Sequence, residues 1–401
     1  MQINDLEIFV VGTPAGTWGG RYFIFVKLTS DDGITGYGEC YASSVGPTAM
    51  QAVIEDVFAR HVAGRNPEDV EVMFRSAYSS GFTQRPDLTV MGAFSGLEMA
   101  CWDIVGKARN RPVHALLGGM VHSRVRAYSY IYPYPGQAHD PATFFSAAEP
   151  QAESALKMVE AGYTALKFDP AGPYTIYDGH QPSLHDMDRS EAVCKALREA
   201  VGSRADLLFG THGQFTTSGA IRMARRIEPY EPLWFEEPCP PDNLLEFQKV
   251  AAQTRIPIAT GERLTTLAEF ATLLRTGGAS ILQPALGRVG GIWQARKIAA
   301  MAEAFNAQMA PHLYAGPVEW AANIQLCAAL PNTLIAETIS TGDDFHADLI
   351  GGTLAVEDGY IGVPTTPGLG IEFNEALARA HPYSGDKLHL EMSPEHNDYR
   401  H

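Results

Sequence analysis

From Val125 onward, short apolar runs that favour β-strands alternate with helical stretches along the chain. The runs, in order, are RAYSYIY, TALKFD, DLLFGTH, LWFEE, IPIATGE, SILQP, AQMAPH and TLIAET. A barrel of parallel strands needs eight strand and helix units, and this region supplies eight strand candidates. The pattern therefore predicts an α/β fold built on a TIM-like barrel.

The residues before the barrel have a different pattern. The segments INDLEIFVV and RYFIFVKLTSDDGITGYGEC alternate as in a small antiparallel sheet, with DDG as a hairpin turn. The segments VIEDVFARHV and FSGLEMACWDIVGKARN then have apolar positions at three- and four-residue steps, which is typical of helices. After the last barrel strand, TTPGLGIEFNEALARA is loop-like and polar, and we expect it to cover the N-terminal sheet.

We therefore expect three parts. Residues 1–124 form an N-terminal α+β domain, and residues 125–364 form the barrel. Residues 365–401 form a C-terminal segment that completes the N-terminal domain.

Composition and charge restrict the class of function. The chain has 401 residues, of which 45% are hydrophobic and 19% charged, as in a soluble enzyme with a large core. A net charge of −16 disfavours nucleic acid and anionic membranes as partners, because both require a basic surface. An anionic substrate would need a local positive centre, such as a buried Lys or a divalent cation.

Cysteine usage and the N-terminus favour a cytoplasmic protein. The five cysteines are widely spaced, which indicates neither a disulfide framework nor a thiolate zinc site. The N-terminal segment MQINDLEIFVV lacks a basic stretch followed by a long apolar one, and no run of about 18 apolar residues occurs. We therefore expect no secretion and no membrane span.

Polar residues stand where the predicted strands end. Glu236 and Glu262 each close an apolar run and lie 26 residues apart, about the length of one strand, one helix and two loops. Barrel active sites are built at the carboxyl ends of the strands, and positions i and i+2 on a strand share a face. The residues expected to converge there are Lys167, Asp169, His212, Glu236, Glu262, His312 and Glu337.

Carboxylates without thiolates favour Mg²⁺, or Mn²⁺, over Zn²⁺, because hard cations prefer oxygen ligands. The histidines and the lysine of the set are then available for proton transfer. The converging set therefore predicts a metal-assisted acid-base site.

Several motifs in fixed order extend this prediction. They are FSGLEMACWDIVGKARNRPVHALLGG, WFEEP, TGE, QPALGRVGGI, APH, LIAET and PGLGIEF. Over essentially its full length the chain resembles the enolase superfamily, in particular the mandelate racemase and muconate lactonizing subgroup. The resemblance implies an α+β capping domain over a modified (β/α)7β barrel, with Mg²⁺ between them. It also implies removal of the proton α to a carboxylate, which gives an enediolate held by the metal.

The resemblance also implies residue roles. Glu236 and Glu262 match metal ligands, His312 matches the base of the seventh strand, and Glu337 matches the electrophile of the eighth. Glu337 can donate a hydrogen bond only if it is protonated, and we expect burial beside apolar neighbours to keep it so. The segment 210–213 is similar to the third strand of galactonate-type acid sugar dehydratases, in which the His protonates the leaving hydroxyl. His212 takes that position here.

Three positions depart from the family pattern. Gly210 stands where the third metal carboxylate is expected, so either His212 becomes a ligand, or water fills the position, or metal binding is poor. Ala285 stands where many relatives have an Asp that pairs with the seventh-strand His. Asp169 follows Lys167 at the position where racemases have a second Lys, which favours dehydration over racemisation by two bases, although Asp169 itself is a potential base.

Specificity is expected to come from the capping domain. The loop PAGTWGGRYF contains Trp18 and Arg21, side chains suited to enclosing a polyol, with Asp169 as a further substrate contact. The loop AGPYTIYDGHQPSLHD, which contains Tyr174, is long enough to form a lid.

We therefore expect a Mg²⁺-dependent dehydratase that converts an aldonate or aldarate, a small sugar acid, into its 2-keto-3-deoxy product. Lys167 would contact the carboxylate, His312 take the α-proton, and His212 protonate the leaving hydroxyl. A cycloisomerase or epimerase of a sugar acid or its lactone is the alternative within the superfamily. A binding or regulatory protein that lost its metal is the alternative from another class. The resemblance further implies a homo-oligomer.

Overall fold

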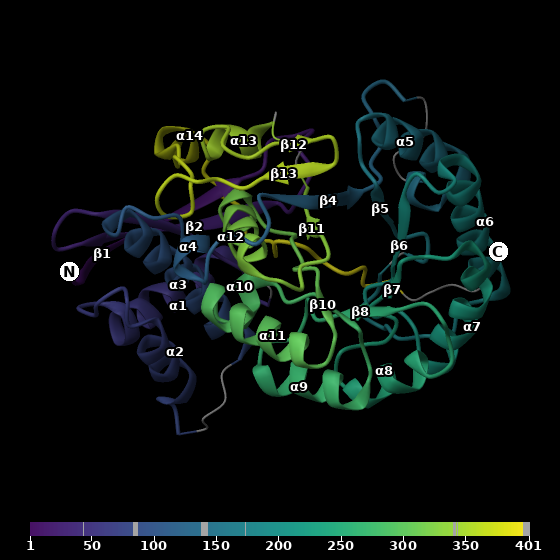
Figure 1. Cartoon of the computed structure of the whole chain (residues 1–401), viewed down its shortest axis with the longest axis horizontal. Helices are drawn as coiled ribbons and strands as arrows, with labels where there is room; N and C mark the ends of the chain where they lie inside the picture. Colours follow the sequence, from purple (N-terminus) through teal and green to yellow (C-terminus); the bar gives the residue numbers. More distant parts are fainter. Residues whose placement is uncertain are drawn as a thin grey trace.

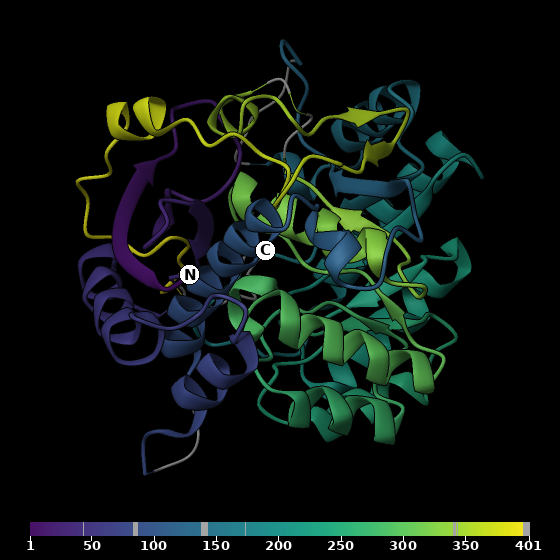
Figure 2. The same cartoon turned by 60° about the vertical axis from the view of Figure 1, so that its left-hand side comes forward.

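The computed structural model describes residues 1–42, 44–82, 87–137, 143–172, 174–339, 342 and 344–395. Figure 1 shows two units side by side, the N-terminal elements and a barrel whose helices lie on the outside. Figure 2 shows the C-terminal elements lying against the N-terminal strands, although they are far apart in sequence. This is the predicted α/β architecture of a barrel with a capping domain.

The N-terminal sheet is the predicted hairpin with one further strand. β1 (Ile3–Gly12), β2 (Tyr22–Ser30) and β3 (Thr35–Cys40) pair antiparallel in that order. Gly33 closes the turn between β2 and β3 with a φ of +83°, a conformation that glycine adopts without steric cost.

Helices follow this sheet in the chain, and one of them packs on β2 and β3. They are α1 (Pro47–Val57) with a π-helical turn (Phe58–Val62), α2 (Val70–Ser79), α3 (Leu88–Ala108) and α4 (Val113–Leu116). α3 packs so closely on β3 that a Cβ at Gly38 would overlap the backbone of Gly96. By length and composition α3 could cross a membrane, but 78% of its apolar window is buried, as expected for the central helix of a folded domain.

All eight predicted barrel strands are present. They are β4 (Arg124–Tyr130), β5 (Ala165–Phe168), β6 (Asp206–Gly210), β7 (Trp234–Glu236), β8 (Ile258–Thr260), β9 (Ile281–Leu282), β10 (Gln308–Met309) and β11 (Ala336–Glu337). Strands β4 to β10 pair parallel in sequence order, and β11 pairs with β4. Met309 of β10 is hydrogen bonded to Asn332 and Leu334, just before β11.

The barrel interior and its outer helices follow the sequence pattern. The interior holds a buried apolar cluster with one residue from or beside each strand: Tyr128, Ala165, Leu208, Trp234, Ala259, Ile281, Ala310 and Ile335. The outer helices are α5 (Ala148–Glu160), α6 (Leu184–Val201), α7 (Thr217–Ile227), α8 (Leu244–Ala251), α9 (Leu267–Thr276), α11 (Ile292–Ala304) and α12 (Pro317–Ala329). Short helices occur at Phe144–Ser146, Glu228–Tyr230 and α10 (Leu286–Val289).

The chain after the barrel returns to the N-terminal domain, as predicted. α13 (Phe345–Leu349) is followed by the hairpin of β12 (Val356–Glu357) and β13 (Tyr360–Gly362), and β13 pairs antiparallel with β4. The tail is not wholly loop-like, because α14 (Glu375–Ala380) forms in it and packs near β1. Tyr383 N–H then donates to Val10 O at 2.9 Å. The predicted boundaries at 124 and 364 stay predictions.

Candidate active site

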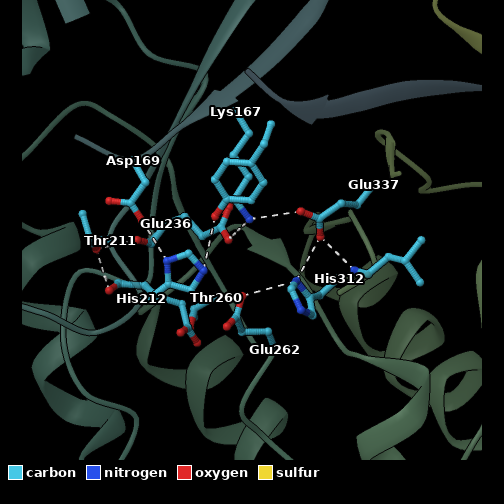
Figure 3. Close-up of polar contacts among 12 residues, drawn as sticks. Lys167, Asp169, Thr211, His212, Glu236, Thr260, Glu262, His312 and Glu337 are labelled. Atoms are coloured by element: carbon cyan, nitrogen blue, oxygen red, sulfur yellow. Dashed lines mark hydrogen bonds and ion pairs between the residues drawn. The ribbon is translucent and has the colours of Figure 1, made fainter. Parts of the chain in front are cut away.

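Ionisable side chains converge where the barrel strands end (Figure 3). Lys167 lies within β5, and Glu236 and Glu337 are the last residues of β7 and β11. The others lie one to three residues beyond β5, β6, β8 and β10: Asp169, His212, Glu262 and His312. The structure thus brings together the residues that the sequence places at the strand ends.

Lys167 is the positive centre of the cluster. Its side chain is fully buried, and Nζ lies 2.6 Å from Glu236 Oε1 and 3.2 Å from Glu337 Oε1. Nζ also lies 4.8 Å from the centre of the Tyr130 ring, in a cation-π contact. Burial alone would lower the pKa of Lys167, but the two carboxylates outweigh burial and raise it well above its usual value. The ammonium therefore stays charged in the barrel mouth.

Glu337 is held differently from the sequence-based expectation. Its Oε2 lies 2.9 Å from His312 Nδ1 and accepts a hydrogen bond from Leu313 N–H at 2.8 Å. Burial would raise the pKa of Glu337, but the charges of Lys167 and His312 outweigh it and lower the pKa to about 2. Burial thus acts in the predicted direction, but in this structure the two neighbouring cations outweigh it. In this arrangement Glu337 accepts hydrogen bonds, and Lys167 is the nearby cationic donor.

His312 obtains its support from two carboxylates. Nδ1 lies 3.3 Å from Glu262 Oε2 in addition to its contact with Glu337. Burial would lower the pKa of His312, but these two carboxylates outweigh burial and raise it. Ala285 itself supplies no carboxylate, so the contacts of His312 come from Glu262, just after β8, and from Glu337, at the end of β11.

His212 lies on the opposite side of the mouth, four strands from His312 in the order of eight. Its Nδ1 is 2.8 Å from Asp169 Oδ2 and 2.7 Å from the Tyr174 hydroxyl, and its Nε2 is 3.2 Å from the Tyr130 hydroxyl. Burial opposes protonation of His212, but Glu262 and Asp169 outweigh burial and raise its pKa. This shift increases the share of the imidazolium form, which is the form that can donate a proton.

The backbone around His212 is strained and cross-linked to the next strand. His212 has a φ of +48° and Glu237 a φ of +45°, in the left-handed region that is unfavourable for side chains other than glycine. The Thr211 hydroxyl lies 2.7 Å from the carbonyls of both Glu236 and Glu237, and Gly213 N–H donates to Glu237 O. These bonds hold the ends of β6 and β7 together and fix the backbone on both sides of His212.

Glu237 and Arg263 form an ion pair behind the converging residues. Arg263 Nε lies 3.2 Å from Glu237 Oε2 and 3.7 Å from Glu262 Oε1. Burial and the charge of Glu262 raise the pKa of Glu237 to about 7. Glu237 thus forms a salt bridge just after β7.

The fit of a divalent cation depends on the carboxylate oxygens. Glu236 Oε2, Glu262 Oε2 and Asp169 Oδ1 are buried and accept no hydrogen bond from the described residues, although Glu262 Oε2 lies 3.3 Å from His312 Nδ1. Such oxygens are the donor type that Mg²⁺ prefers, so the donor chemistry of Glu236 and Glu262 fits the predicted cation. Within the part of the chain that the structure describes, however, no three His, Cys, Asp or Glu side chains are grouped as a ligand set. Metal ligation by His212 stays a prediction.

Gly210 accounts for the missing third carboxylate. A Cβ added there would lie 3.4 Å from Lys167 Cε and 3.6 Å from Asp169 Oδ2, which is ordinary contact. The position therefore faces the converging residues, as the i and i+2 argument predicts, but it supplies no side chain.

Trp18 and Arg21, the two substrate contacts predicted from the capping domain, have different surroundings. Trp18 stacks on Tyr132 at 4.2 Å between ring centres, and its side chain is partly exposed. Tyr132 is partly buried, and burial together with Tyr314 and Glu337 raises its pKa. Arg21 instead donates to Leu388 O at 2.9 Å and pairs with Glu391 at 3.1 Å, so its described contacts lie in the C-terminal segment.

Some site residues were not identified from the sequence. Tyr130 contacts both Lys167 and His212, and Arg288 donates to Glu262 O at 2.6 Å. The alternation of RAYSYIY, which places Tyr128, Tyr130 and Tyr132 on one face, was the available signal for the tyrosines. The signal for Arg288 was weak, because an Arg in a helical turn usually lies on the surface.

Comparisons with known proteins agree with the fold. Residues 8–118 match the family "Mandelate racemase / muconate lactonizing enzyme, N-terminal domain", and residues 151–377 match "Enolase C-terminal domain-like". A D-galactonate dehydratase from Ralstonia nicotianae is 33% identical over 363 residues, which cover 88% of this chain and 90% of that protein. A D-gluconate dehydratase from Thermoproteus tenax is 32% identical over 377 residues, which cover 94% of this chain and 72% of that protein.

Among solved structures, a mandelate racemase/muconate lactonizing enzyme from Sulfitobacter sp. superposes with a TM-score of 0.97 at 65% identity, and the match covers 100% of both chains. The two family matches cover the capping domain and most of the barrel. The predicted superfamily and fold are therefore confirmed, and the chain belongs to the mandelate racemase and muconate lactonizing enzyme family, with the enolase-superfamily architecture of a capping domain on a (β/α)7β barrel.

Proposed function

We propose that this chain is an acid sugar dehydratase that converts an aldonate or aldarate into a 2-keto-3-deoxy sugar acid. The observation that carries the proposal is the placement of His212 and His312 on opposite sides of the barrel mouth, with the buried Lys167 ammonium between them. Dehydration next to a carboxylate needs one group to remove the α-proton and another to protonate the departing hydroxyl. Relatives named dehydratases support a lyase of this type.

The residues of the chain divide the reaction between them. Lys167 attracts the substrate carboxylate and neutralises the charge that develops on it when the α-proton leaves. His312 accepts the α-proton from one face, after it has lost its own proton. His212, whose pKa is raised by Glu262 and Asp169 against the effect of burial, protonates the β-hydroxyl from the other face, so that water can leave.

Members of the enolase superfamily generally use Mg²⁺. Glu236 and Glu262 are the residues that would hold it here, because each has a buried carboxylate oxygen without a hydrogen-bond partner among the described residues. When bound, the cation supplies further positive charge against the carboxylate oxygens of the substrate. Mn²⁺ has the same ligand preference and is the second candidate.

A cycloisomerase or epimerase that acts on a sugar acid or its lactone is a second candidate function. Ala285 favours it, because His312 pairs with Glu337 and Glu262 instead of the usual Asp, and this changes the base that receives the α-proton. In both reactions the substrate is a small carboxylic acid or its ester. A homo-oligomeric state, a cytoplasmic location and the lack of nucleic-acid or membrane partners stay predictions.

The test is a library of aldonates, aldarates and their lactones incubated with the full-length protein in the presence and absence of Mg²⁺. We expect a 2-keto-3-deoxy product from at least one acid, detected as a semicarbazone and by NMR. Glu262→Gln, which keeps the side-chain size but removes the charge, is the control and should remove this activity. A product isomeric with its substrate, without loss of water, would instead establish the second candidate.

A further inference from the structure

The C-terminal residues 388–393 connect two loops that border the candidate site. One loop, at residues 13–22, belongs to the capping domain, and the other follows β5 and contains Tyr174. In Figure 1 the last part of the chain passes from the N-terminal sheet toward the barrel. The segment 388–393 is called the strap below.

The strap is anchored to the capping domain by hydrogen bonds to two adjacent residues. Arg21 N–H donates to His389 O at 3.1 Å, and the Arg21 guanidinium binds Leu388 O and Glu391. His389 Nδ1 lies 2.6 Å from Tyr22 O. These bonds involve backbone groups of the strap and of the capping-domain loop. They therefore fix the path of the strap backbone as well as its side chains.

His389 is the buried anchor of the strap. The residue is 5% exposed, and its ring lies edge-on to the rings of Tyr22, Phe23 and Tyr41. Its Nε2 lies 3.3 Å from Tyr314 O, in the segment that follows His312. A Cβ at Gly20 would overlap this ring, so the glycine leaves the space that His389 fills.

The other end of the strap holds the loop after β5. Ser393 N–H donates to Tyr174 O at 2.9 Å, and Ile176 N–H donates to Ser393 O at 2.9 Å. Thr175 and Ser393 therefore form a parallel β-bridge. The Tyr174 hydroxyl then lies 2.7 Å from His212 Nδ1, with its ring edge-on to the imidazole at 4.6 Å between centres.

We propose that Tyr174 is a positioning residue for His212 and that the strap, anchored by His389, holds it in place. The effect of the strap on catalysis rests on the function proposed above. The effect of the strap on the loop that carries Tyr174 does not. His212 follows a strand in a strained backbone conformation, so its ring direction depends on its neighbours. Loops such as the one that carries Tyr174 move unless other elements tie them down. A small misplacement of an acid-base group lowers the rate strongly, because proton transfer requires close alignment.

The first test compares His389→Ala with Leu390→Ala in the full-length protein by hydrogen-deuterium exchange. Leu390 is the adjacent strap residue, and its side chain is 59% exposed, so its loss should leave the strap in place. We expect faster exchange at residues 174–182 in His389→Ala only. Gly20→Ala, which displaces the His389 ring from the other side, should have the same effect and serves if His389→Ala does not fold.

The second test is kinetic and uses Tyr174→Phe, which removes only the hydroxyl. We expect kcat to fall about tenfold with KM nearly unchanged and with normal exchange in the loop. His389→Ala should lower kcat at least as much. Equal exchange and equal kcat in His389→Ala and Leu390→Ala would overturn the role of the strap, and a normal kcat in Tyr174→Phe would overturn the role of Tyr174.

The two proposals can fail separately. If no sugar acid in the library is converted, the exchange experiment still decides whether the strap holds the Tyr174 loop, because it needs no turnover. If dehydration is found but the exchange of residues 174–182 is insensitive to His389, the proposed function stands and the strap does not.

Discussion

The two histidines at the barrel mouth are held by different kinds of structure. His312 follows β10, its side chain is 6% exposed, and its partners Glu262 and Glu337 lie on or just after barrel strands. His212 has a side chain that is 20% exposed, and its partners include Tyr130 of β4 and Tyr174 of a loop. The rigid barrel therefore orients His312, whereas loops and the C-terminal strap contribute to orienting His212.

This difference matches the two proposed tasks. In the proposed reaction the α-proton is carried by the carbon next to the carboxylate, which Lys167 would hold at a fixed position, so the group that accepts this proton can be fixed as well. The β-hydroxyl lies further along the substrate, and its position depends on the configuration of the sugar. A proton donor held by loops permits specificity to change without alteration of the barrel.

Substitution of each histidine in turn should have the largest effect and tests whether the two histidines have different roles. We expect both His312→Asn and His212→Asn to reduce dehydration about a hundredfold to ten-thousandfold, because each removes one general acid or base. Incubation of each variant with substrate in deuterium oxide separates the two roles. His212→Asn should still exchange the α-proton for deuterium, whereas His312→Asn should not.

The opposite pattern of exchange would assign the α-proton to His212 and reverse the proposed roles. Lys249→Ala, a substitution of an exposed residue on α8, serves as the control and should retain both activities.

Adding a third carboxylate to Glu236 and Glu262, on the side of the mouth where His212 lies, should have a smaller effect, on the affinity for a divalent cation. The Gly210 position faces Lys167 and Asp169 with room for a Cβ, so Gly210→Asp should add a third carboxylate. We expect the affinity for Mn²⁺, measured by calorimetry and electron paramagnetic resonance, to rise about tenfold, since hard cations bind more tightly as carboxylates are added.

Gly210→Asn is the matched control for that experiment, because it has the same size without the charge. Equal affinity in the Asp and Asn variants would show that the cation does not reach this side of the mouth and would weaken its assignment to Glu236 and Glu262.

The smallest effect is expected for Glu319, a buried carboxylate on α12, and concerns the pH dependence of stability. Glu319 accepts a hydrogen bond from Gly287 N–H, and burial raises its pKa from 4.5 to about 7. A carboxyl group whose pKa is higher in the folded state binds its proton more tightly there, so folding is most favoured at low pH. This contribution to the free energy of unfolding is full below about pH 4.5 and is lost as the pH rises through about 7.

Glu319→Gln should therefore reduce the fall in Tm between about pH 5 and about pH 8, which differential scanning calorimetry would measure. Glu375→Gln is the contrasting control. Hydrogen bonding to Lys27 lowers the pKa of Glu375 to about 2, so its contribution is present above about pH 4.5 and is lost only in acid. An unchanged pH dependence in Glu319→Gln would mean that this carboxyl group is not protonated in the folded protein.

Much of the architecture followed from the sequence, because its cause is periodic and local. Alternation in β1 to β3 and the eight apolar runs of the barrel are set by side chains only a few residues apart. The convergence of Lys167, Glu236 and Glu337 also followed, since parallel strands bring their carboxyl ends to one side of a barrel. The sequence pattern does not predict the helix α14, because the segment that contains it is loop-like and polar in character.

The charge state of the site was decided only by tertiary structure. The sequence predicted a protonated Glu337 from its apolar neighbours Leu334 and Ile335, but Lys167, which is 170 residues away in the chain, lies beside it. The electrostatic energy of a buried carboxyl group depends on the distances to charges on other strands, and sequence spacing does not report them.

The partners of His212 and His312 illustrate the same limit. The sequence shows two histidines, a lysine and several acids at the strand ends. It also shows that Gly210 and Ala285 supply no carboxylate where one is expected. Only the folded chain pairs His212 with Asp169 and His312 with Glu337, and only there does the C-terminal segment reach the loop of Tyr174. Residue types and strand periodicity thus determine which chemical groups are present at the mouth, whereas distances of a few ångströms between remote segments determine their charge, orientation and use.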